Sequence, residues 1–224
     1  MHNICIAIDG PAGVGKTTVG KIIAKKLGYV FLDTGIMYRI IAYLCLKKNI
    51  NYHSLDEIHS LIEKTIFEIK SNNDIRCNGI NIVNDENLNS KSVLNIVSDI
   101  AKIKYVRIKI ADIQRKFALN NSVVMVGRDV VTFIVPNALI KIFLTANLET
   151  RAKRRYKEFI DKNISFEEIK ENIEKRDFID KNRDFSPLRK AFDAIEIDTS
   201  DLDVDDVVNL FFKIFKEKMI NKNV

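Results

Sequence analysis

A glycine-rich stretch near the start of the chain, IDGPAGVGKT at residues 8–17, has the spacing of a phosphate-binding loop. Gly10, Gly15, Lys16 and Thr17 match the pattern G-x-x-x-x-G-K-[ST], in which backbone N–H groups turn inward around phosphate oxygens. The lysine supplies positive charge to the β- and γ-phosphates, and the threonine hydroxyl is a ligand for Mg²⁺. We therefore expect ATP and Mg²⁺ here, with Thr17 on the metal. The residues expected at the triphosphate are Gly10, Pro11, Ala12, Gly13, Val14, Gly15, Lys16, Thr17 and Thr18.

Arginines farther along the chain suggest what is done with the phosphate. Transfer of a phosphoryl group to a second small anion requires two mutually repelling phosphates to be brought into line by several guanidinium groups. The candidates are Arg39, Arg107, Arg128, Arg151, Arg154, Arg155, Arg176 and Arg183. The aspartates that could orient them, or bind a sugar hydroxyl or a base amine, are Asp33, Asp129, Asp177 and Asp180. Taken singly, many such neighbours are surface ion pairs worth under about 1 kcal/mol each.

The apolar pattern predicts the elements that must position these groups. Near-continuous apolar runs are typical of strands covered on both faces of a parallel sheet. The runs are 4–8, 29–32, 123–126, 139–144 and 194–197. Helical patterns after 4–8, near 35–48, 102–119 and 149–160, and from Val204 onward separate or follow these runs. The alternation indicates a three-layer α/β/α fold with right-handed crossovers around a five-stranded parallel sheet.

Local signals mark helix ends and one interruption. Gly28 can end the first helix in a left-handed conformation. Capping boxes are predicted for two other helices, Ser54 with Glu57 and Ser165 with Glu168. Between about 66 and 90, the dipeptide Asn78-Gly79 predicts a type I′ hairpin, which in a parallel core is most simply an inserted lobe.

Composition limits the class of protein. The 224 residues are 46% hydrophobic, enough for the core of one domain, and the net charge of +6 suits either a nucleic-acid surface or a site for small phosphate esters. No apolar run is long enough to span a membrane, and no basic leader precedes the first one, so we expect a cytoplasmic protein. Cys5, Cys45 and Cys77 lack a metal-like spacing and are expected to be free thiols.

A phosphate-binding loop by itself is shared by several classes of protein. The chain is too short for a large motor, and it contains no N/T-K-x-D motif for reading guanine. A phosphotransferase that acts on a small anion fits the arginines best. An alternative from another class is a nucleic-acid-binding regulator with a vestigial loop, which RNA binding with a steep salt dependence and no ATP turnover would favour.

Over nearly its whole length the chain resembles the bacterial cytidylate kinases, which are nucleoside monophosphate kinases. The matching stretches are IAIDGPAGVGKTTVGKIIAKKLGYVFLDTGIMYR (6–39), NIVSDIAKIKYVR (95–107), GRD (127–129), PNALIKIFLTANLETRAKRR (136–155) and RDFIDKNRDFSPLRKAFDAIEIDTSDL (176–202). The resemblance implies direct in-line transfer of the γ-phosphoryl group of ATP to CMP or dCMP, giving ADP and CDP or dCDP. It also implies a monomer with no nucleic-acid or membrane partner.

The resemblance further implies a division of the chain. One kinase domain, 1–224, would have a core of 1–59, 101–150 and 166–224, a monophosphate-binding lobe at 60–100 and a lid at 151–165. The lobe would cover the monophosphate and the lid the triphosphate, so that closure excludes water and suppresses hydrolysis.

Roles for individual residues follow from the resemblance, position by position. The residues expected at the acceptor nucleotide are Thr34, Tyr38, Arg39, Ser98, Arg107, Arg128, Asp129, Arg176, Asp180 and Arg183. Among them, Arg39, Arg128 and Arg183 correspond to the grip on the acceptor phosphate. The expected catalytic residues are Lys16, Arg128, Arg151 and Arg155. Arg151 and Arg155 open the lid, and either could reach the transferring phosphoryl group.

The remaining acceptor residues correspond to positions that hold the nucleoside. Ser98, Arg107 and Asp129 match residues that read the cytosine ring, and Arg176 and Asp180 match residues that hold the ribose. Because cytosine carries an exocyclic amine, a carboxylate discriminates it from uracil, whose carbonyl would leave a buried carboxylate unpaired.

Two positions depart from the family pattern acidic-Gly-Arg-Asp-x-Gly-Thr. Val126 replaces an acidic residue that can help hold Mg²⁺ through water. Either Asp33 or Asp9 takes over this role, or Mg²⁺ is held by Thr17 and the phosphates alone. Val131 replaces a glycine at a point where positive φ or a close approach is expected, so we expect the neighbourhood of the base pocket to be reshaped. Kinases for UMP, AMP or shikimate therefore remain the nearest alternatives.

Overall fold

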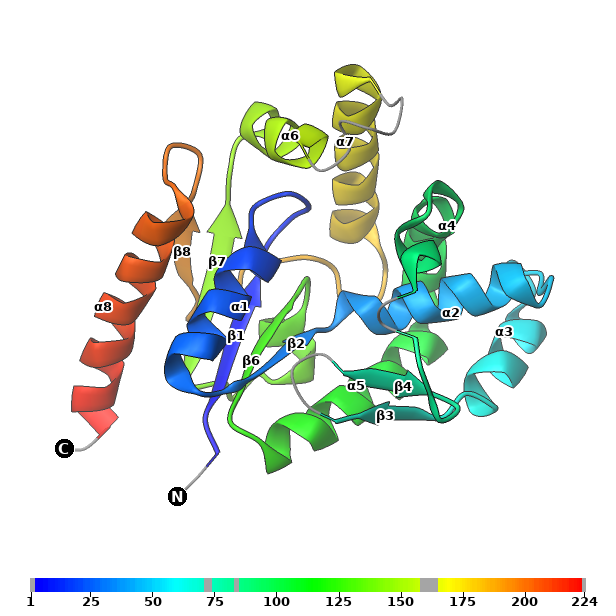
Figure 1. The fold of residues 1–224 in the computed structure, drawn as a ribbon, viewed down its shortest axis with the longest axis horizontal. Helices are drawn as coiled ribbons and strands as arrows, with labels where there is room; N and C mark the ends of the chain where they lie inside the picture. Colours follow the sequence, from blue (N-terminus) through cyan, green and yellow to red (C-terminus); the bar gives the residue numbers. More distant parts are fainter. Residues whose placement is uncertain (1–2, 71–73, 83–84, 158–164, 223–224) are drawn as a thin grey trace.

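A five-stranded sheet lies at the centre of the structure, a computed structural model that describes residues 3–70, 74–82, 85–157 and 165–222 (Figure 1). All five strands run parallel, in the order β2-β6-β1-β7-β8. They are β1 (Cys5–Asp9), β2 (Val30–Asp33), β6 (Val123–Gly127), β7 (Ile140–Thr145) and β8 (Ile195–Asp198). Each begins within one residue of a predicted run, so the predicted five-stranded parallel sheet is confirmed.

Helices cover both faces of this sheet, because successive residues of a strand point to opposite sides. The four covering helices are α1 (Lys16–Leu27), α2 (Gly35–Lys47), α5 (Lys104–Asn120) and α8 (Val204–Lys222). On one face, Ile6 and Ile8 of β1 pack in an apolar cluster with α1 and α8. On the other face, Ala7 and Met125 pack with α2 and α5. The three-layer arrangement is visible in Figure 1.

The remaining helices lie around the carboxyl ends of the strands and the small lobe. They are α3 (Leu55–Glu63), α4 (Lys91–Lys102), α6 (Leu148–Lys157), α7 (Phe166–Asn182), a 3₁₀ helix (Glu86–Asn89) and a π-helical turn (Val130–Ile134). The helix predicted near 149–160 corresponds to α6, and its residues beyond Lys157 lie outside the described ones. Neither α4 nor the π-helical turn was anticipated.

The predicted hairpin is confirmed within a small antiparallel sheet. Strands β3 (Phe67–Ile69), β4 (Ile75–Cys77) and β5 (Ile80–Asn81) pair in the order β3-β4-β5. Asn78 and Gly79 join the last two with φ values of 51° and 79°, as a type I′ turn requires. Phe67, Ile75 and Cys77 are buried in the same apolar cluster as α2, so this sheet is anchored to the parallel core.

Of the two predicted capping boxes, the one at Ser165 is complete and the one at Ser54 has a single hydrogen bond. Ser165 accepts a hydrogen bond from the N–H of Glu168, and the Glu168 carboxylate accepts one from the N–H of Ser165, as predicted. Ser54 caps α3 through the N–H of Glu57, but the Glu57 carboxylate instead accepts from the N–H of Asn51. The reciprocal bond expected there does not form, because the N–H of Ser54 already donates to the carbonyl oxygen of Asn51.

Two simpler expectations concern the cysteines and membrane spans. Cys5, Cys45 and Cys77 are free thiols, as expected. Among the described residues, no helix combines the length and the apolar character needed to cross a bilayer.

Candidate active site

The phosphate-binding loop, residues 10–17, leaves β1 and runs directly into α1. Gly10 has a φ of 150°, and a Cβ there would lie 2.2 Å from the carbonyl oxygen of Leu144, so only glycine fits. Gly15 caps α1 with a φ of 91°. The loop therefore sits at the positive end of the α1 dipole, where an anion is stabilised.

Lys16 is folded back over this loop. Its Nζ donates to the carbonyl oxygens of Gly10 and Pro11, at 2.7 and 2.6 Å. Burial lowers the pKa of Lys16 well below its ordinary value, and the positive charge of Arg128 adds to that effect. The ammonium group is thus held by two carbonyls of the loop itself.

Thr17, Asp33 and Arg39 form a chain of contacts beside the loop. Oγ1 of Thr17 lies 3.4 Å from Oδ2 of Asp33, and Nη2 of Arg39 lies 3.4 Å from the same oxygen. The second carboxylate oxygen of Asp33 accepts from the N–H of Gly35, and Arg39 also donates to Asn89. One arginine of the expected acceptor grip therefore lies next to the expected metal ligand.

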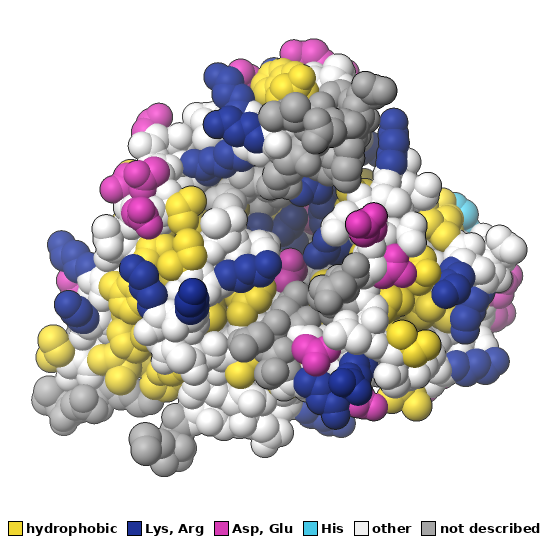
Figure 2. Space-filling view, in the orientation of Figure 1, with side chains coloured by type: hydrophobic (Ala, Val, Ile, Leu, Met, Phe, Trp, Pro, Cys, Tyr) yellow, Lys and Arg dark blue, Asp and Glu magenta, His cyan; other side chains and the backbone are white. Residues whose placement is uncertain are grey.

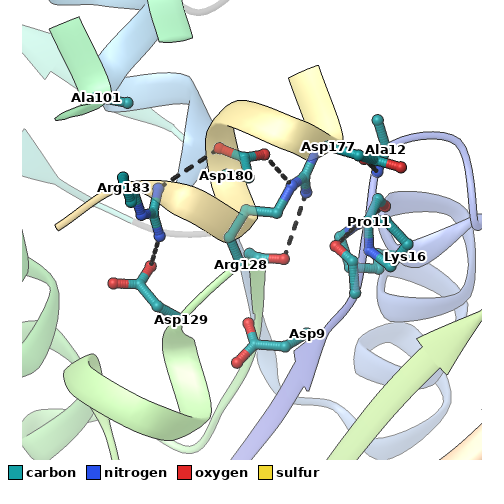
Figure 3. A network of polar contacts seen from close by, with 12 residues as sticks. Asp9, Pro11, Ala12, Lys16, Ala101, Arg128, Asp129, Asp177, Asp180 and Arg183 are labelled. Atoms are coloured by element: carbon teal, nitrogen blue, oxygen red, sulfur yellow. Dashed lines mark hydrogen bonds and ion pairs between the residues drawn. The ribbon is translucent and has the colours of Figure 1, made fainter. Parts of the chain in front are cut away.

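Arg128 and Arg183 share a carboxylate from α7 (Figure 3). Nε of Arg128 donates to Oδ2 of Asp180 at 2.9 Å, and Nη1 of Arg183 lies 3.5 Å from Oδ1 of the same residue. Burial acts to raise the pKa of Asp180, but the surrounding charges of Arg128, Arg176 and Arg183 outweigh it and hold the pKa below its ordinary value. Asp180 therefore stays ionised and fixes two arginines of the predicted grip.

A second carboxylate, Asp129, connects Arg183 to Arg107. Nη2 of Arg183 lies 3.6 Å from Oδ1 of Asp129, while Arg107 and the hydroxyl of Ser186 donate to Oδ2. Arg107 is 2% exposed and stacks over the Tyr38 ring, with its guanidinium carbon 5.4 Å from the ring centroid. Burial raises the pKa of Tyr38 to about 12, so its hydroxyl stays protonated.

Arg176 shows that these groups face a common centre. Burial, together with the positive charges of Arg128, Arg155 and Arg39, lowers the pKa of Arg176 to about 10, against the opposing effect of Asp180. In the described part of the chain, Nε of Arg176 and Nη2 of Arg183 are buried without a hydrogen-bond partner. Figure 2 shows Lys and Arg side chains gathered inside a hollow on this face. Such orphaned donors suit an anionic ligand.

Thr34 directly follows Asp33 and caps α2, whereas Ser98 lies on α4. Oγ1 of Thr34 donates to the carbonyl oxygen of Val126 at 2.9 Å, and the carbonyl of Thr34 accepts from Nε2 of Gln114 at 3.1 Å. Ser98 is half-buried on α4. Sequence reasoning missed Gln114, although a glutamine within the apolar pattern of the predicted helix 102–119 is a usable signal of a buried polar contact.

Arg151 points away from the centre that the other arginines share. Its guanidinium donates to the carbonyl oxygens of Ala146 and Ala12, each at 3.0 Å, and to Asp177. Arg155, one turn later on α6, is half-buried and close enough to Arg176 to lower the pKa of Arg176. The two lid arginines therefore have different surroundings.

Asp9 is committed to the backbone. Its two carboxylate oxygens accept from the N–H groups of Val130 and Val131, at 2.9 and 2.8 Å. Burial raises the pKa of Asp9 to about 7, and the charge of Asp129 also acts to raise it. Of the alternatives for replacing the missing acidic residue at position 126, Asp33 fits better because it lies beside Thr17.

The two departures from the family pattern have structural reasons. Val126 lies in the apolar cluster below α1, facing Gly20, and not toward the loop. The expected positive φ at Val131 is wrong, since positive φ outside glycine occurs, among the described residues, at Asn49, Asn78 and Ser186. Val131 is part of the π-helical turn, and its side chain is buried in the core.

The residues present fit a magnesium ion held mainly by phosphate and water oxygens. Among the described residues, no group of three or more His, Cys, Asp or Glu side chains is arranged as a metal site. The hydroxyl of Thr17 and the carboxylate of Asp33 are hard oxygen donors, and Mg²⁺ in nucleotide sites takes few protein ligands.

A model of the cytidylate kinase family matches residues 6–217 of this chain. The chain belongs to the cytidylate kinase family. It is 41% identical to a cytidylate kinase from Fusobacterium nucleatum over 215 residues, which covers 95% of this chain and 97% of that protein. It is 44% identical to a cytidylate kinase from a Geobacillus strain over 223 residues, 97% and 99% of the two chains.

A solved structure shares the fold of this cytidylate kinase family member. An uncharacterized protein from Eubacterium ventriosum matches with a TM-score of 0.52 and 18% identity, covering 96% of this chain and 99% of that one. The likeness concerns the fold alone.

Proposed function

We propose that this protein is a cytidylate kinase that transfers the γ-phosphoryl group of ATP to CMP or dCMP. The observation that supports this best is the convergence of Arg39, Arg128, Arg176 and Arg183 on one centre beside the phosphate-binding loop. An oxygen of the acceptor phosphate attacks the γ-phosphorus while the bond to the β–γ bridging oxygen breaks, giving ADP and CDP or dCDP. Positioning and charge neutralisation supply the catalysis, without a covalent enzyme intermediate.

The catalytic groups proposed at the transferring phosphoryl are Lys16, Arg128 and Arg155. Lys16 must exchange its contacts with the carbonyls of Gly10 and Pro11 for phosphate oxygens when ATP binds. Of the two lid arginines we favour Arg155, because Arg151 is held by two carbonyls and Asp177.

The acceptor phosphate is proposed to lie against Arg39, Arg128 and Arg183, with Thr34 and Tyr38 beside it. Its oxygens would accept a hydrogen bond from Nη2 of Arg183, which is buried without one and lies 3.6 Å from Asp129. The residues proposed for the nucleoside are Ser98, Arg107 and Asp129 at the base and Arg176 and Asp180 at the ribose. The ion pair between Arg107 and Asp129 supports this assignment, because it fixes the orientation of a carboxylate that can accept a hydrogen bond from an amine.

Mg²⁺ is proposed to bind at Thr17, with Asp33 nearby to hold its water ligands. When bound, Mg²⁺ neutralises charge on the β- and γ-phosphate oxygens. Asp33 would in addition tie the position of Thr17 to that of Arg39, because it contacts both.

The division into moving parts is also a proposal. The core comprises 1–59, 101–150 and 166–224, the lobe 60–100 closes over the acceptor, and the lid 151–165 closes over the triphosphate. Of the lid, residues 158–164 lie outside the described ones. We further propose a cytoplasmic monomer.

Turnover with a panel of acceptors tests the proposed function. ADP release should be fastest with CMP or dCMP, and slower with UMP, AMP or shikimate. Lys16→Ala should lower kcat for every acceptor by about a hundredfold or more, because it removes charge at the transferring group. Faster turnover with UMP, AMP or shikimate than with CMP would overturn the assignment of the acceptor. RNA binding with a steep salt dependence and no turnover of ATP would favour the nucleic-acid alternative.

A further inference from the structure

Ala12, in the middle of the phosphate-binding loop, is held by both of its backbone groups. Its N–H donates to Oδ1 of Asp177 at 3.2 Å, and its carbonyl oxygen accepts from Nη1 of Arg151 at 3.0 Å. The same Nη1 donates to Oδ2 of Asp177, which closes a ring of three contacts. Figure 3 shows Asp177 of α7 next to Ala12. Three segments that are far apart in the sequence therefore meet at one loop residue.

The ring is buried and closely packed. Arg151 is 8% exposed and Asp177 is 6% exposed. A Cβ on Gly13 would lie 3.0 Å from the carbonyl oxygen of Arg151, so the loop is in direct contact with the backbone of α6. A third contact of Arg151, to the carbonyl oxygen of Ala146, ties the same guanidinium to the end of β7. These contacts of Nε and Nη1 hold the buried ion pair in a defined orientation.

Asp177 belongs to the helix that carries the acceptor residues. It directly follows Arg176, and Asp180 and Arg183 lie one and two turns farther on. Helix α7 therefore contacts the phosphate-binding loop through Asp177 and contacts Arg128 of the proposed acceptor site through Asp180. The separation between the two sites depends on how α7 is attached to the loop.

We propose that Arg151 and Asp177 are positioning residues that attach the phosphate-binding loop to α7 and so set the alignment of the triphosphate with the acceptor. This inference rests on the proposed function for the identity of the acceptor. The pair acts through the backbone of Ala12: it keeps the loop in the shape that binds the triphosphate and keeps α7 at the distance that in-line transfer requires.

Separate titrations of the two ligands test this role. The probes are CMP alone and the non-hydrolysable analogue adenylyl imidodiphosphate with Mg²⁺ alone, each measured by calorimetry. Asp177→Ala should weaken binding of the analogue about tenfold and change CMP affinity less than about twofold, since the contacts of Arg128, Asp180 and Arg183 remain. At saturation with both substrates, kcat should fall about a hundredfold from misalignment.

Two further variants separate positioning from general stability. Asp177→Asn keeps an acceptor for the N–H of Ala12 but removes the charge opposite Arg151, so its losses should be smaller than those of Asp177→Ala. Asp193→Asn breaks a more exposed ion pair with Lys141, away from this site, and should leave both affinities and kcat unchanged. In the double variant Arg151→Gln with Asp177→Asn, the fold-losses in analogue affinity and in kcat should be smaller than the products of the losses in the two single variants. The reason is that the two residues act as a unit.

Two results would overturn the inference. One is wild-type binding of the analogue together with wild-type kcat in Asp177→Ala. The other is that Asp177→Ala weakens CMP and analogue binding equally and also lowers the melting temperature. That result would make the pair a general stabilising contact. If the wild-type protein bound the analogue but did not phosphorylate CMP, the proposed function would fail, and the analogue titration would still decide the role of the pair.

Discussion

At the scale of single residues, the buried carboxylates decide where the arginines point. Asp180 and Asp129 hold Arg128, Arg183 and Arg107 by ion pairs, and Asp9 holds the backbone that directly follows Arg128 and Asp129. By accepting from the N–H groups of Val130 and Val131, the Asp9 carboxylate orients the π-helical turn as a capping residue orients the start of a helix. Asp9 is therefore expected to influence the acceptor site without contacting the substrate.

Replacing Asp9 should remove a pH dependence of stability. Burial raises the pKa of Asp9 from 3.8 to about 7, so the folded protein keeps a proton that the unfolded chain releases between these values. The contribution of this proton to stability is complete below pH 3.8 and decreases as the pH rises to about 7. Asp9→Asn cannot ionise and should lack this slope. Urea unfolding across the window should show the wild-type protein losing stability relative to the variant as the pH rises, and a constant difference would contradict this.

Replacing Arg183 should weaken acceptor use and leave the donor site intact. Arg183→Ala removes a guanidinium that contacts Asp129 and Asp180. The KM for CMP should therefore rise and kcat should fall, so that kcat/KM decreases by about a hundredfold. Binding of an ATP analogue should be nearly unchanged. The exposed Arg189 offers a matched control, and Arg189→Ala should behave like the wild-type protein. Wild-type kinetics in Arg183→Ala would mean that the phosphate grip is misassigned.

At the scale of the elements, the position of α1 depends on a close approach to the sheet. A Cβ on Gly20 would lie 2.6 Å from Cγ1 of Val126 and 2.9 Å from Cε2 of Phe31. The valine at position 126 thus fills the space beneath α1, and α1 presents its amino end to the phosphate-binding loop. The apolar residue at this position is explained by packing.

Adding a methyl group at Gly20 should be destabilising, and shortening Val126 should relieve part of the effect. Gly20→Ala crowds the contact between α1 and β6 and should lower the free energy of unfolding by about 1–3 kcal/mol. In the double variant with Val126→Ala, the loss should be smaller than the sum of the two single losses, because the alanine vacates the space that the new methyl needs. Denaturant unfolding of all four proteins measures this, and strictly additive losses would contradict the contact.

At the scale of the whole molecule, the two proposed sites form one concentration of positive charge. Arg39, Arg128 and Arg155 all lower the pKa of Arg176, and Arg128 and Arg176 lower that of Lys16. The net charge of +6 is thus concentrated in part at a single hollow, where like charges repel until an anion binds. This arrangement favours small phosphate esters over an extended nucleic acid.

Inorganic phosphate should therefore stabilise the protein more than chloride does. At about ten times its dissociation constant, phosphate should raise the melting temperature by about 3–6 °C compared with sodium chloride at the same ionic strength. Arg128→Gln removes one of the repelling charges and should reduce the difference. Equal effects of the two salts on the wild-type protein would show that the cluster does not act as an anion site.

Features that depend on neighbours in the sequence could be predicted without the structure. The loop at 10–17, the five strand runs and the turn at Asn78-Gly79 are each set by backbone freedom, side-chain period or local charge within a few residues. The same holds for the cap at Ser165. The resemblance added a role for each of the candidate arginines, and the structure places Arg39, Arg128, Arg176 and Arg183 near one another.

Features that depend on partners far along the chain were decided only by the tertiary structure. Asp9 binds the backbone of Val130 and Val131, Arg151 turns to Ala12 and Asp177, and Val126 faces α1. The sequence by itself determined which charged and small residues the chain carries and which elements hold them. Which carboxylate meets which arginine or backbone group depends on residues that are far apart in the sequence, 52 positions for Arg128 and Asp180 and 165 for Ala12 and Asp177, and such contacts exist only once the layers have packed.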